Sequence, residues 1–539
     1  MSKRIVPFII AIPSLLLLFV FKLLPAINTL IISLKNYNFL NGLFNSPFVG
    51  LKNYNDLFNS IHFVRLFGNT FRLSFFAILF TCFLAVLLII CISNMPNRIL
   101  KTISIVIISI PAFIPIASYL GIIMRALSAN SGIVNQILIS LGSEPQLFLA
   151  EQQYSTLIFA LTEALRNVYI PVIIGVLACE QKGPNPGKIL TVILIYALVR
   201  ATLFFSPDWE LLNLISNPLV YGKTDVIDIY TFRTGLAQMQ LSTSSALWVI
   251  KTIAQLVVNI LIYFILYSVL PELKGMVGTL TDKVNRKGGA IISILGFILL
   301  ALGSIGIAAG VLFPALLGQY TASFKGIGFI LSNTWFASAI FNSLIYCLLA
   351  CIIYGFLTVT LAYPLTTKTK AYPIILVFIM SLTNNLVGEY VFFRSLGLFN
   401  SYFGVILQSG LSVVGAFGLY FVVSGKFENE VPTPSEYIKE SLLPLITIVG
   451  LFFISTWGGF MYQLIFITDK QFFGIGLTMR ELIQAGDIQS LVAYNVPIGE
   501  LKSAAILISS IIPAVLGSSL ICFNKVLPLS AFSSQVRKG

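Results

Sequence analysis

The chain is poor in charge and in histidine, and each shortage excludes a class of protein. Charged residues make up 10% of the 539 residues, whereas soluble domains usually carry about a quarter. A series of soluble globular domains is therefore excluded. The single histidine is His62, no metal-ligand spacing occurs, and no nucleophile motif is present. We expect no metal, no cofactor and no enzyme acting on its own.

The sequence also lacks a nucleotide-binding loop and a disulfide framework. No Gly-x-x-x-x-Gly-Lys-Ser/Thr pattern occurs anywhere in the chain. The six cysteines lie within or at the edge of apolar runs, where they act as small hydrophobic residues. The net charge is +13, but the basic residues are scattered singly and in pairs between apolar runs. We expect no nucleic-acid partner, and we assign the basic residues to orienting the chain in a membrane.

Long apolar runs are abundant instead. The chain is 57% hydrophobic with a mean hydropathy of +0.94, and about 20 helical residues cross a bilayer core. The sequence predicts an all-α polytopic membrane protein of about twelve transmembrane helices. The expected spans are 5–33, 67–93, 99–125, 154–179, 188–206, 244–270, 290–318, 338–366, 371–393, 404–424, 441–468 and 500–524. The basic N-terminus is followed by no small-residue cleavage site, so 5–33 is expected to be an uncleaved span.

The spans divide into two sets of six around a polar, basic linker at 271–289. Asn69-Thr70 opens the second span and Asn342-Ser343 opens the eighth, at an offset of 273 residues. A second echo pairs "SGIVNQIL" at 131–138 with "LGLFNSYF" at 396–403. We predict two parallel six-helix repeats, 1–270 and 290–539, because each has an even number of spans.

Basic residues concentrate in alternate loops. Seven short segments hold 17 of the 33 basic residues, namely Lys3/Arg4, Arg98/Lys101, Lys182/Lys188, Lys274/Lys283/Arg286/Lys287, Lys368/Lys370, Lys426/Lys439 and Lys525/Arg537/Lys538. Cytoplasmic loops carry such an excess. Both termini and the linker are therefore expected in the cytoplasm.

Charged residues at membrane depth are the first candidate functional group. Glu163, Arg166 and Asn167 lie in "LIFALTEALRNVYIPVIIGVLA", and the i,i+3 spacing of the two charged residues predicts that they pair on one helix face. Two interpretations stay open. The pair specifies helix packing, or it lines a solute path, since charges inside membranes usually face a cavity.

A second candidate is an interrupted span at 455–466, "STWGGFMYQLIF". A Gly-Gly pair breaks the helix between Trp457, Phe460 and Tyr462. Broken helices are tolerated at membrane depth where they line a cavity, and aromatic faces suit the C–H faces of sugar rings. The alternatives are an aromatic belt and close helix packing.

Together these segments resemble permease subunits of binding-protein-dependent ABC sugar importers of the maltose type. The first half matches through "PSLLLLFVFKLLPAINTLIISLKNYN", "FVGLKNYNDLF" and "NTFRLS", and "NPLVYGKTDVIDIYTFRTGL" is similar to the polysaccharide- and lipoprotein-type branch. The second half matches through "NTWFASAIFNSLIYC", "FRSLGLFNSYFGVIL" and "SLLPLITIVGLFFISTWGGFMYQLIFIT". Two subunits that are normally separate would be fused here.

The resemblance implies a location and a set of partners. We expect a permease in the bacterial plasma membrane that moves a saccharide or similar solute. Its expected partners are cytoplasmic ABC ATPase subunits and an extracellular solute-binding lipoprotein. In this family a short helix after the fourth span of each subunit docks on the ATPase.

The expected docking loops are degenerate. "FENEVPTPSEYIKESLLPL" lacks the family's Ala-Ala and Gly, and its prolines interrupt a helix. A short helix could start at Ser435 as its N-cap. The candidate coupling residues are Glu428, Glu430, Ser435, Glu436, Tyr437 and Lys439. The first-half loop at 178–193 leaves no room for a docking helix, so a permease-derived scaffold or receptor that has lost ATP-driven transport is the alternative function. A solvated turn is the alternative for 425–445.

Overall fold

The computed structural model describes residues 4–95, 97–129, 132–179, 184–266, 324–424, 427, 431–484 and 498–522, which form helices and their connections. No strand occurs in these ranges apart from an isolated bridge between Lys35 and Phe48. The predicted linker at 271–289 and the predicted span at 290–318 lie outside the described residues.

The described part up to residue 266 contains the following elements: α1 (Val6–Leu18), η1 (Phe19–Leu23), α2 (Leu24–Ser33), α3 (Gly42–Asn45), α4 (Lys52–Phe58), α5 (Ile61–Ser93), α6 (Arg98–Phe113), α7 (Ile116–Ala126), α8 (Ile133–Ser140), α9 (Gln152–Asn167), α10 (Tyr169–Cys179), α11 (Pro186–Ala201), α12 (Trp209–Ile215), α13 (Tyr221–Thr224), α14 (Ile227–Tyr230), η2 (Thr231–Ala237) and α15 (Leu241–Phe264). Of these, η1 and η2 are π-helical.

The part from residue 324 contains α18 (Phe324–Ser332), α19 (Thr334–Ala362), the 3-10 helix η5 (Pro364–Thr367), α20 (Ala371–Ser381), α21 (Leu386–Ser395), α22 (Tyr402–Gly410), α23 (Val414–Val423), α24 (Pro434–Trp457), α25 (Met461–Phe466), the 3-10 helix η7 (Lys470–Phe472), α26 (Ile475–Gln484) and α28 (Ile498–Cys522).

An all-helical membrane fold is confirmed. Among the described residues, six helices are long and apolar enough to cross a bilayer, and the number rises to ten if each of four bent pairs is one span. Helix α11, in the predicted span 188–206, has only 16 residues, fewer than the roughly 20 that cross a bilayer core. The ten candidates match ten of the twelve predicted spans in order.

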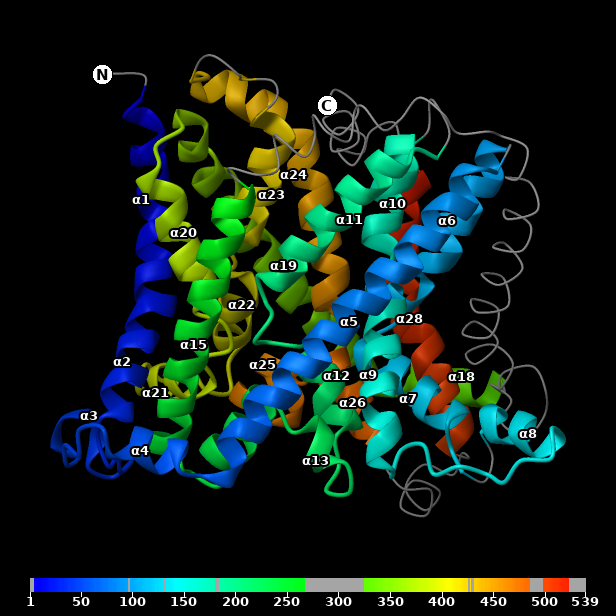
Figure 1. Ribbon diagram of the computed structural model, residues 1–539, viewed down its shortest axis with the longest axis horizontal. Helices are drawn as coiled ribbons and strands as arrows, with labels where there is room; N and C mark the ends of the chain where they lie inside the picture. Colours follow the sequence, from blue (N-terminus) through cyan, green and yellow to red (C-terminus); the bar gives the residue numbers. More distant parts are fainter. Residues whose placement is uncertain are drawn as a thin grey trace.

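The long helices run between two faces of the molecule, and the helix ends alternate between them (Figure 1). Helix α1 begins and α28 ends at the upper face. The C-terminal ends of α5, α10 and α23 and the N-terminal ends of α6, α11, α20 and α24 also lie there. Lys101, Lys188 and Lys370, which the sequence analysis assigned to the basic loops, lie at three of these helix ends. The lower face carries α3, α4, α8 and α13.

The bent pairs recur in the same order in both parts of the chain. Helices α6 and α7 meet at 96°, and α20 and α21 meet at 88°. Helices α9 and α10 then meet at 46°, and α22 and α23 meet at 41°. Proline explains the first bend, because Pro115 has an extended backbone and cannot continue α6. Asn384, with φ of 47°, lies at the matching break before α21.

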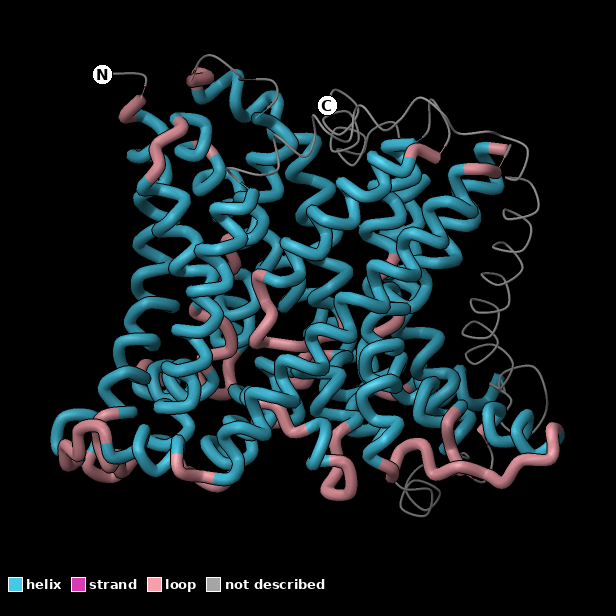
Figure 2. Tube along the Cα trace, in the orientation of Figure 1, coloured by secondary structure: helices cyan, strands magenta, loops and turns pink. Residues whose placement is uncertain are grey.

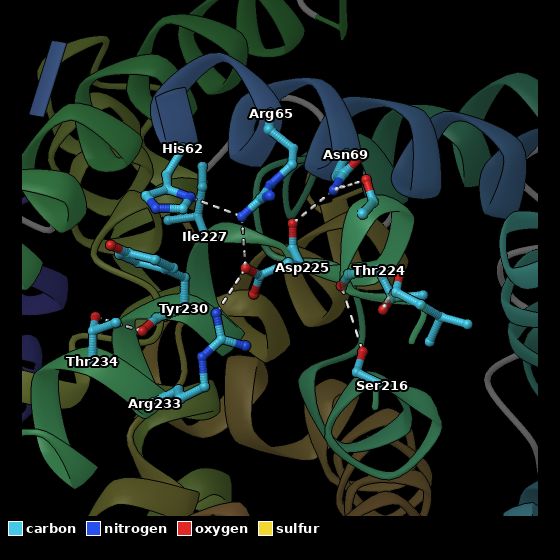
Figure 3. Close-up of polar contacts among 12 residues, drawn as sticks. His62, Arg65, Asn69, Ser216, Thr224, Asp225, Ile227, Tyr230, Arg233 and Thr234 are labelled. Carbon is cyan, nitrogen blue, oxygen red and sulfur yellow. Dashed lines mark hydrogen bonds and ion pairs between the residues drawn. The ribbon is translucent and has the colours of Figure 1, made fainter. Parts of the chain in front are cut away.

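The Asn-Thr echo in the sequence corresponds to an equivalent set of hydrogen bonds. Near the start of α5, Asn69 donates to the carbonyls of Gly222 and Asp225 at 3.2 and 3.0 Å. The neighbouring hydroxyl of Thr70 accepts from the backbone N–H of Ile227 at 3.2 Å, and Figure 3 shows Asn69 beside Asp225. The first-half asparagine thus fixes the chain segment that leads into α14.

In α19, Asn342 donates in the same way to the carbonyls of Gln471 and Phe473, at 2.8 and 2.9 Å. The Ser343 hydroxyl accepts from the backbone N–H of Ile475 at 2.7 Å. Ile227 and Ile475 lie 248 residues apart. We call these two arrangements the asparagine clamps, and they show that the halves build the same local structure.

The first span packs against the second half of the chain. Leu18 is buried in one apolar cluster with Leu357, Leu361 and Tyr363. The Ser14 and Thr360 hydroxyls lie 2.5 Å apart. The halves are therefore interlocked at α1.

Candidate functional site

A cavity of about 440 Å³ lies where the two halves meet. Four of its lining residues come from the connection between α11 and α12, which is a loop at mid-depth of the bundle (Figure 2). Most of its lining is polar, together with one tryptophan. The lining residues are Asn167, Arg200, Leu203, Ser206, Pro207, Asp208, Trp209, Glu210, Thr383, Asn384 and Met461.

The predicted pairing of Glu163 with Arg166 is wrong. Glu163 is 1% exposed and forms an ion pair with Arg200, which comes from α11 rather than from the same helix. Arg166 instead donates to the carbonyls of Pro111 and Ile114, at 3.0 and 2.8 Å. Those carbonyls are left free where Pro115 ends α6, and a guanidinium satisfies them. Arg166 therefore stabilises a bend.

Of the predicted path residues in α9, Asn167 reaches the cavity directly. Its amide donates to the Glu163 carbonyl at 3.1 Å, one turn back in the helix. Glu163 does not line the cavity but lies behind Arg200, which does. The sequence prediction therefore identified one lining residue and one supporting carboxylate.

The predicted break between α24 and α25 is present. Helix α24 ends at Trp457 and α25 begins at Met461. The carboxylate of Glu210 accepts the backbone N–H groups of Phe460 and Met461, at 2.6 and 2.7 Å. Glu210 thus satisfies donors at the start of α25, where a negative charge is favoured, and joins the cavity lining to the broken helix.

The aromatic residues of this break do not line the cavity. Trp457 is 1% exposed, and its indole N–H donates to the carbonyl of Ser509 at 2.8 Å. Phe460 is fully buried, and Tyr462 is stacked near Phe466 with ring centroids 6.3 Å apart. Close helix packing, one of the alternatives for this segment, describes their positions. Met461 is the residue of the break that reaches the cavity.

A buried lysine joins the halves beside the cavity. Lys251 of α15 is fully buried and contacts Asp228 at 2.6 Å and the Thr383 carbonyl at 3.1 Å. The second oxygen of Asp228 accepts from Asn384 at 2.7 Å. Because one carboxylate binds groups from both halves, it fixes the position of the α20–α21 break.

A second buried pair ties the first span to the other half. Lys22 of η1 lies 3.0 Å from Glu389 and donates to Gln408 at 2.6 Å. The Glu389 side chain is 1% exposed. The ammonium of Lys22 neutralises it.

The upper-face segment before α24 differs from the sequence prediction. Helix α24 begins at Pro434 with Thr433 as its N-cap, not Ser435. The Thr433 hydroxyl accepts from the Glu436 N–H at 3.4 Å, and the Glu436 carboxylate accepts from the Thr433 N–H at 2.9 Å. This capping box uses proline at the first helical position, where a missing N–H costs nothing. The helix is also long, running on into the bundle.

The candidate coupling residues point in different directions. Tyr437 is 1% exposed, stacks on Tyr363 at 4.4 Å, and donates to the Val359 carbonyl at 3.0 Å. It therefore anchors α24 to the end of α19. Ser435, Glu436 and Lys439 are exposed on the same turns. Glu428 and Glu430 lie outside the described residues.

The matching connection in the first half is short. Helix α10 ends at Cys179 and α11 begins at Pro186, with Asn185 capping its first N–H groups at 3.0 and 3.2 Å. Only the residues 180–185 lie between, less than two turns of helix. This agrees with the prediction that 178–193 has no room for a docking helix.

Several lining residues were missed by sequence reasoning. Asp208 is the N-cap of the short helix α12, Glu210 lies in its first turn, and Asn384 lies at a helix break. A signal was present in the chain: "SPDWE" at 206–210 and "TNN" at 383–385 are polar segments directly after apolar runs. Polar segments that end or interrupt apolar spans are tolerated where they line a cavity.

The chain was compared with known proteins. No family model matches it. It is 22% identical over 270 residues to Protein LplB of Bacillus subtilis, an alignment that covers 46% of this chain and 85% of LplB. It is 23% identical over 276 residues to YteP of the same bacterium, the polygalacturonan/rhamnogalacturonan transport system permease protein. That alignment covers 47% of this chain and 85% of YteP. In about half of its length, the chain is similar to permeases of ABC sugar importers.

Each curated relative accounts for just under half of this permease. Among solved structures, a bacterial ABC transporter involved in the import of the acidic polysaccharide alginate is 20% identical, with a TM-score of 0.41, covering 51% of the permease and 96% of that chain. The bacterial alginate transporter in complex with an alginate pentasaccharide-bound periplasmic protein is 21% identical, with a TM-score of 0.42. That match covers 48% of this chain and 92% of the other. The permease is a multi-pass protein of the bacterial plasma membrane.

Proposed function

We propose that this permease carries a saccharide through a path at the junction of two permease units, 1–270 and 290–539, joined by a linker at 271–289. Both termini lie in the cytoplasm in this proposal. Cytoplasmic ABC ATPase subunits drive the cycle, and an extracellular solute-binding lipoprotein delivers the solute. The permease itself catalyses no reaction.

The cavity between the halves carries this proposal. Its lining offers hydroxyl and amide groups from Ser206, Asn167 and Asn384, together with Trp209. Such groups match a saccharide, which needs hydrogen-bond partners at its rim and apolar contact on its ring faces. The name of YteP assigns that relative to saccharide transport, which supports the same class of solute here.

Helix α24 suits the transmission of movement from an ATPase to the cavity. Its exposed upper turns carry Ser435, Glu436 and Lys439. Its lower end is followed after three residues by Met461, which lines the cavity. A helix of 24 residues is about 36 Å long, so one continuous helix connects both places. The contact must differ in affinity between the states that the ATPase favours.

The decisive experiment measures coupled ATP hydrolysis. The tagged full chain is purified in mild detergent from cells that encode it, and a co-purifying ABC ATPase is identified by mass spectrometry. In proteoliposomes, saccharide with its binding lipoprotein is expected to raise ATP hydrolysis at least threefold. Lys439→Glu in α24 is expected to abolish this stimulation. Lys188→Glu in α11 makes the same charge change in the first half and is expected to have little effect.

A membrane scaffold without transport is the second candidate, and the short α10–α11 connection favours it. In that case the purified chain captures no ATPase, and no saccharide changes ATP hydrolysis. Stable capture of an ATPase that depends on Lys439 would rule the scaffold out. Stimulation that survives Lys439→Glu but not Lys188→Glu would move the coupling contact to the first half.

A further inference from the structure

A cluster of cationic side chains lies near α13 and the start of α5 in the first half, and Figure 3 shows two of them, Arg65 and Arg233, around Asp225. Arg65 and Arg72 come from α5, Lys223 from α13 and Arg233 from η2. None of them lines the cavity described above. We call these four residues the outer cationic surface.

One buried carboxylate lies beneath this surface. Asp225 is fully buried, and its Oδ2 atom lies 2.8 Å from Arg233 and 3.6 Å from Arg65. Arg65 also shares a hydrogen bond with His62 Nδ1 at 2.8 Å. Arg72 donates to backbone and amide oxygens, including the carbonyl of Lys223 at 2.8 Å. Asp225 therefore contacts two of the four cations, and these five charged residues together carry an excess of three positive charges.

The guanidinium groups are partly held inside the protein. Among the residues that the structure describes, the Arg233 Nη1 and Arg65 Nε atoms are buried without a hydrogen-bond partner, and Arg233 lies over the Tyr221 ring at 4.3 Å from its centroid. Both side chains stay partly accessible, with 28% and 37% of their surface exposed. Lys223 is exposed as well. Planar guanidinium groups bind carboxylates well, often through two hydrogen bonds at once.

The fold does not require these cations. The asparagine clamp of the second half has the same geometry, yet the positions equivalent to Arg65 and Arg233 are Ser338 and Glu481, and the position equivalent to Asp225 is Phe473. Glu481 there lies 3.8 Å from Lys470, so that pair is neutral overall. The positive charge is thus a property of one half.

We propose that the outer cationic surface binds acidic side chains of the solute-binding partner and sets the orientation in which that partner docks. This rests on the proposed function, which supplies the partner. A partner that spans both halves meets the same clamp geometry twice, so the clamps do not by themselves distinguish its two orientations. Positive charge on one half favours one orientation and disfavours the other. The four side chains come from three elements, which suits a broad protein surface.

The test uses the full chain in nanodiscs of phosphatidylcholine, with a hexaglutamate peptide as the acidic probe. Affinity is measured at low salt and again at 0.5 M NaCl. A carbodiimide then couples bound peptide to nearby lysines, and mass spectrometry compares Lys223 with Lys470. Lys470 is 72% exposed on the second half, next to the equivalent clamp. The variants are Arg65→Gln/Arg233→Gln, the charge-preserving Arg65→Lys/Arg233→Lys, and Lys470→Gln as a matched control.

We expect hexaglutamate to couple to Lys223 at least fivefold more than to Lys470, and to bind about tenfold more weakly to Arg65→Gln/Arg233→Gln. The lysine variant is expected to keep most of the affinity, which separates loss of charge from misfolding. Lys470→Gln is expected to change nothing. Equal coupling at both lysines, or equal affinity of the glutamine variant, would overturn the proposal.

A second arm uses trigalacturonate, which carries the same carboxylates on a saccharide. Displacement of hexaglutamate by trigalacturonate at a similar concentration would overturn docking in favour of a site for acidic saccharides. The result of this binding experiment can be distinguished from the result of the ATPase experiment. Charge-dependent binding in a chain without saccharide-stimulated ATP hydrolysis would reject transport and keep the acidic-partner surface.

Discussion

At the scale of single residues, this permease neutralises its buried charges across long sequence distances. Glu163 pairs with Arg200, Lys251 with Asp228 and Lys22 with Glu389. A carboxylate at membrane depth without a partner is costly. Removing one member of a buried pair typically costs about 3–5 kcal/mol, whereas replacing both members often costs much less.

Arg200→Gln is therefore expected to destabilise the permease more than the double variant Glu163→Gln/Arg200→Gln. The single variant leaves the buried Glu163 carboxylate without a cation, whereas the double variant removes the charge. Thermal unfolding in detergent measures the stability of both variants. Together with the single variant Glu163→Gln, they form a double-mutant cycle that gives the interaction energy of the Glu163–Arg200 pair. Equal destabilisation by Arg200→Gln and the double variant would contradict a buried ion pair.

Sequence reasoning found the right residues but the wrong partner for Glu163. Spacing along one helix identifies neighbours on the same face, and this favoured Arg166. Arg200 lies on another helix, and only packing brings it to Glu163. The N-cap of α24 was misplaced by two residues for a similar reason, because Pro434 was taken as an interruption. At the first turn of a helix, proline is favourable.

At the scale of elements, the α24–α25 break depends on close backbone contact. A Cβ atom at Gly458 would lie 2.5 Å from Pro115 Cα, in the first half. At the neighbouring Gly459, the nearest atom would be Thr456 O at 3.3 Å. The break therefore packs directly against the α6–α7 bend.

Gly458→Ala is expected to lower the thermal unfolding temperature by several degrees, because the Pro115 backbone must move. Overpacking of this kind costs about 1–3 kcal/mol. Gly459→Ala, with more room, serves as the matched control and is expected to have a smaller effect. An equal or larger effect at Gly459 would mean that the two halves do not meet through Gly458.

The asparagine clamps give a second element-scale prediction. Asn69→Ala is expected to speed hydrogen exchange at 222–227, and Asn342→Ala to speed it at 471–475, each without affecting the other segment. Each change removes hydrogen bonds to two carbonyls, which costs about 1–3 kcal/mol where a buried group stays unpaired. Mass spectrometry of peptide fragments reports the exchange. Faster exchange in both segments of either variant would argue against two independent clamps.

Element positions were predicted well where apolar runs are long, and poorly elsewhere. Ten spans follow the predicted order, since a run of about 20 apolar residues has one stable placement in a bilayer. The elements α12, α13, α14 and η2 have no more than seven residues each, too few for a periodic pattern. Their arrangement depends on Asn69, Asp225 and Lys251, which come together only in the folded chain.

At the scale of the whole molecule, the positive-inside distribution gives a testable orientation. Ser435→Cys at the upper face and Ser143→Cys in the connection after α8 are introduced into a chain without its native cysteines. A membrane-impermeant maleimide added to intact cells is expected to label Ser143→Cys and to leave Ser435→Cys unlabelled until the cells are opened. The reverse labelling would invert the proposed topology.

Synthesis of the chain leaves the Lys22 charge unpaired for an appreciable time. Lys22 and Glu389 are separated by 367 positions, and ribosomes add about 5–20 residues per second. The lysine therefore waits roughly 20–70 s for its carboxylate to be made. During this interval its ammonium must reach toward water or toward a component of the insertion machinery. Completion of the second half, rather than insertion of the first span, ends this exposure.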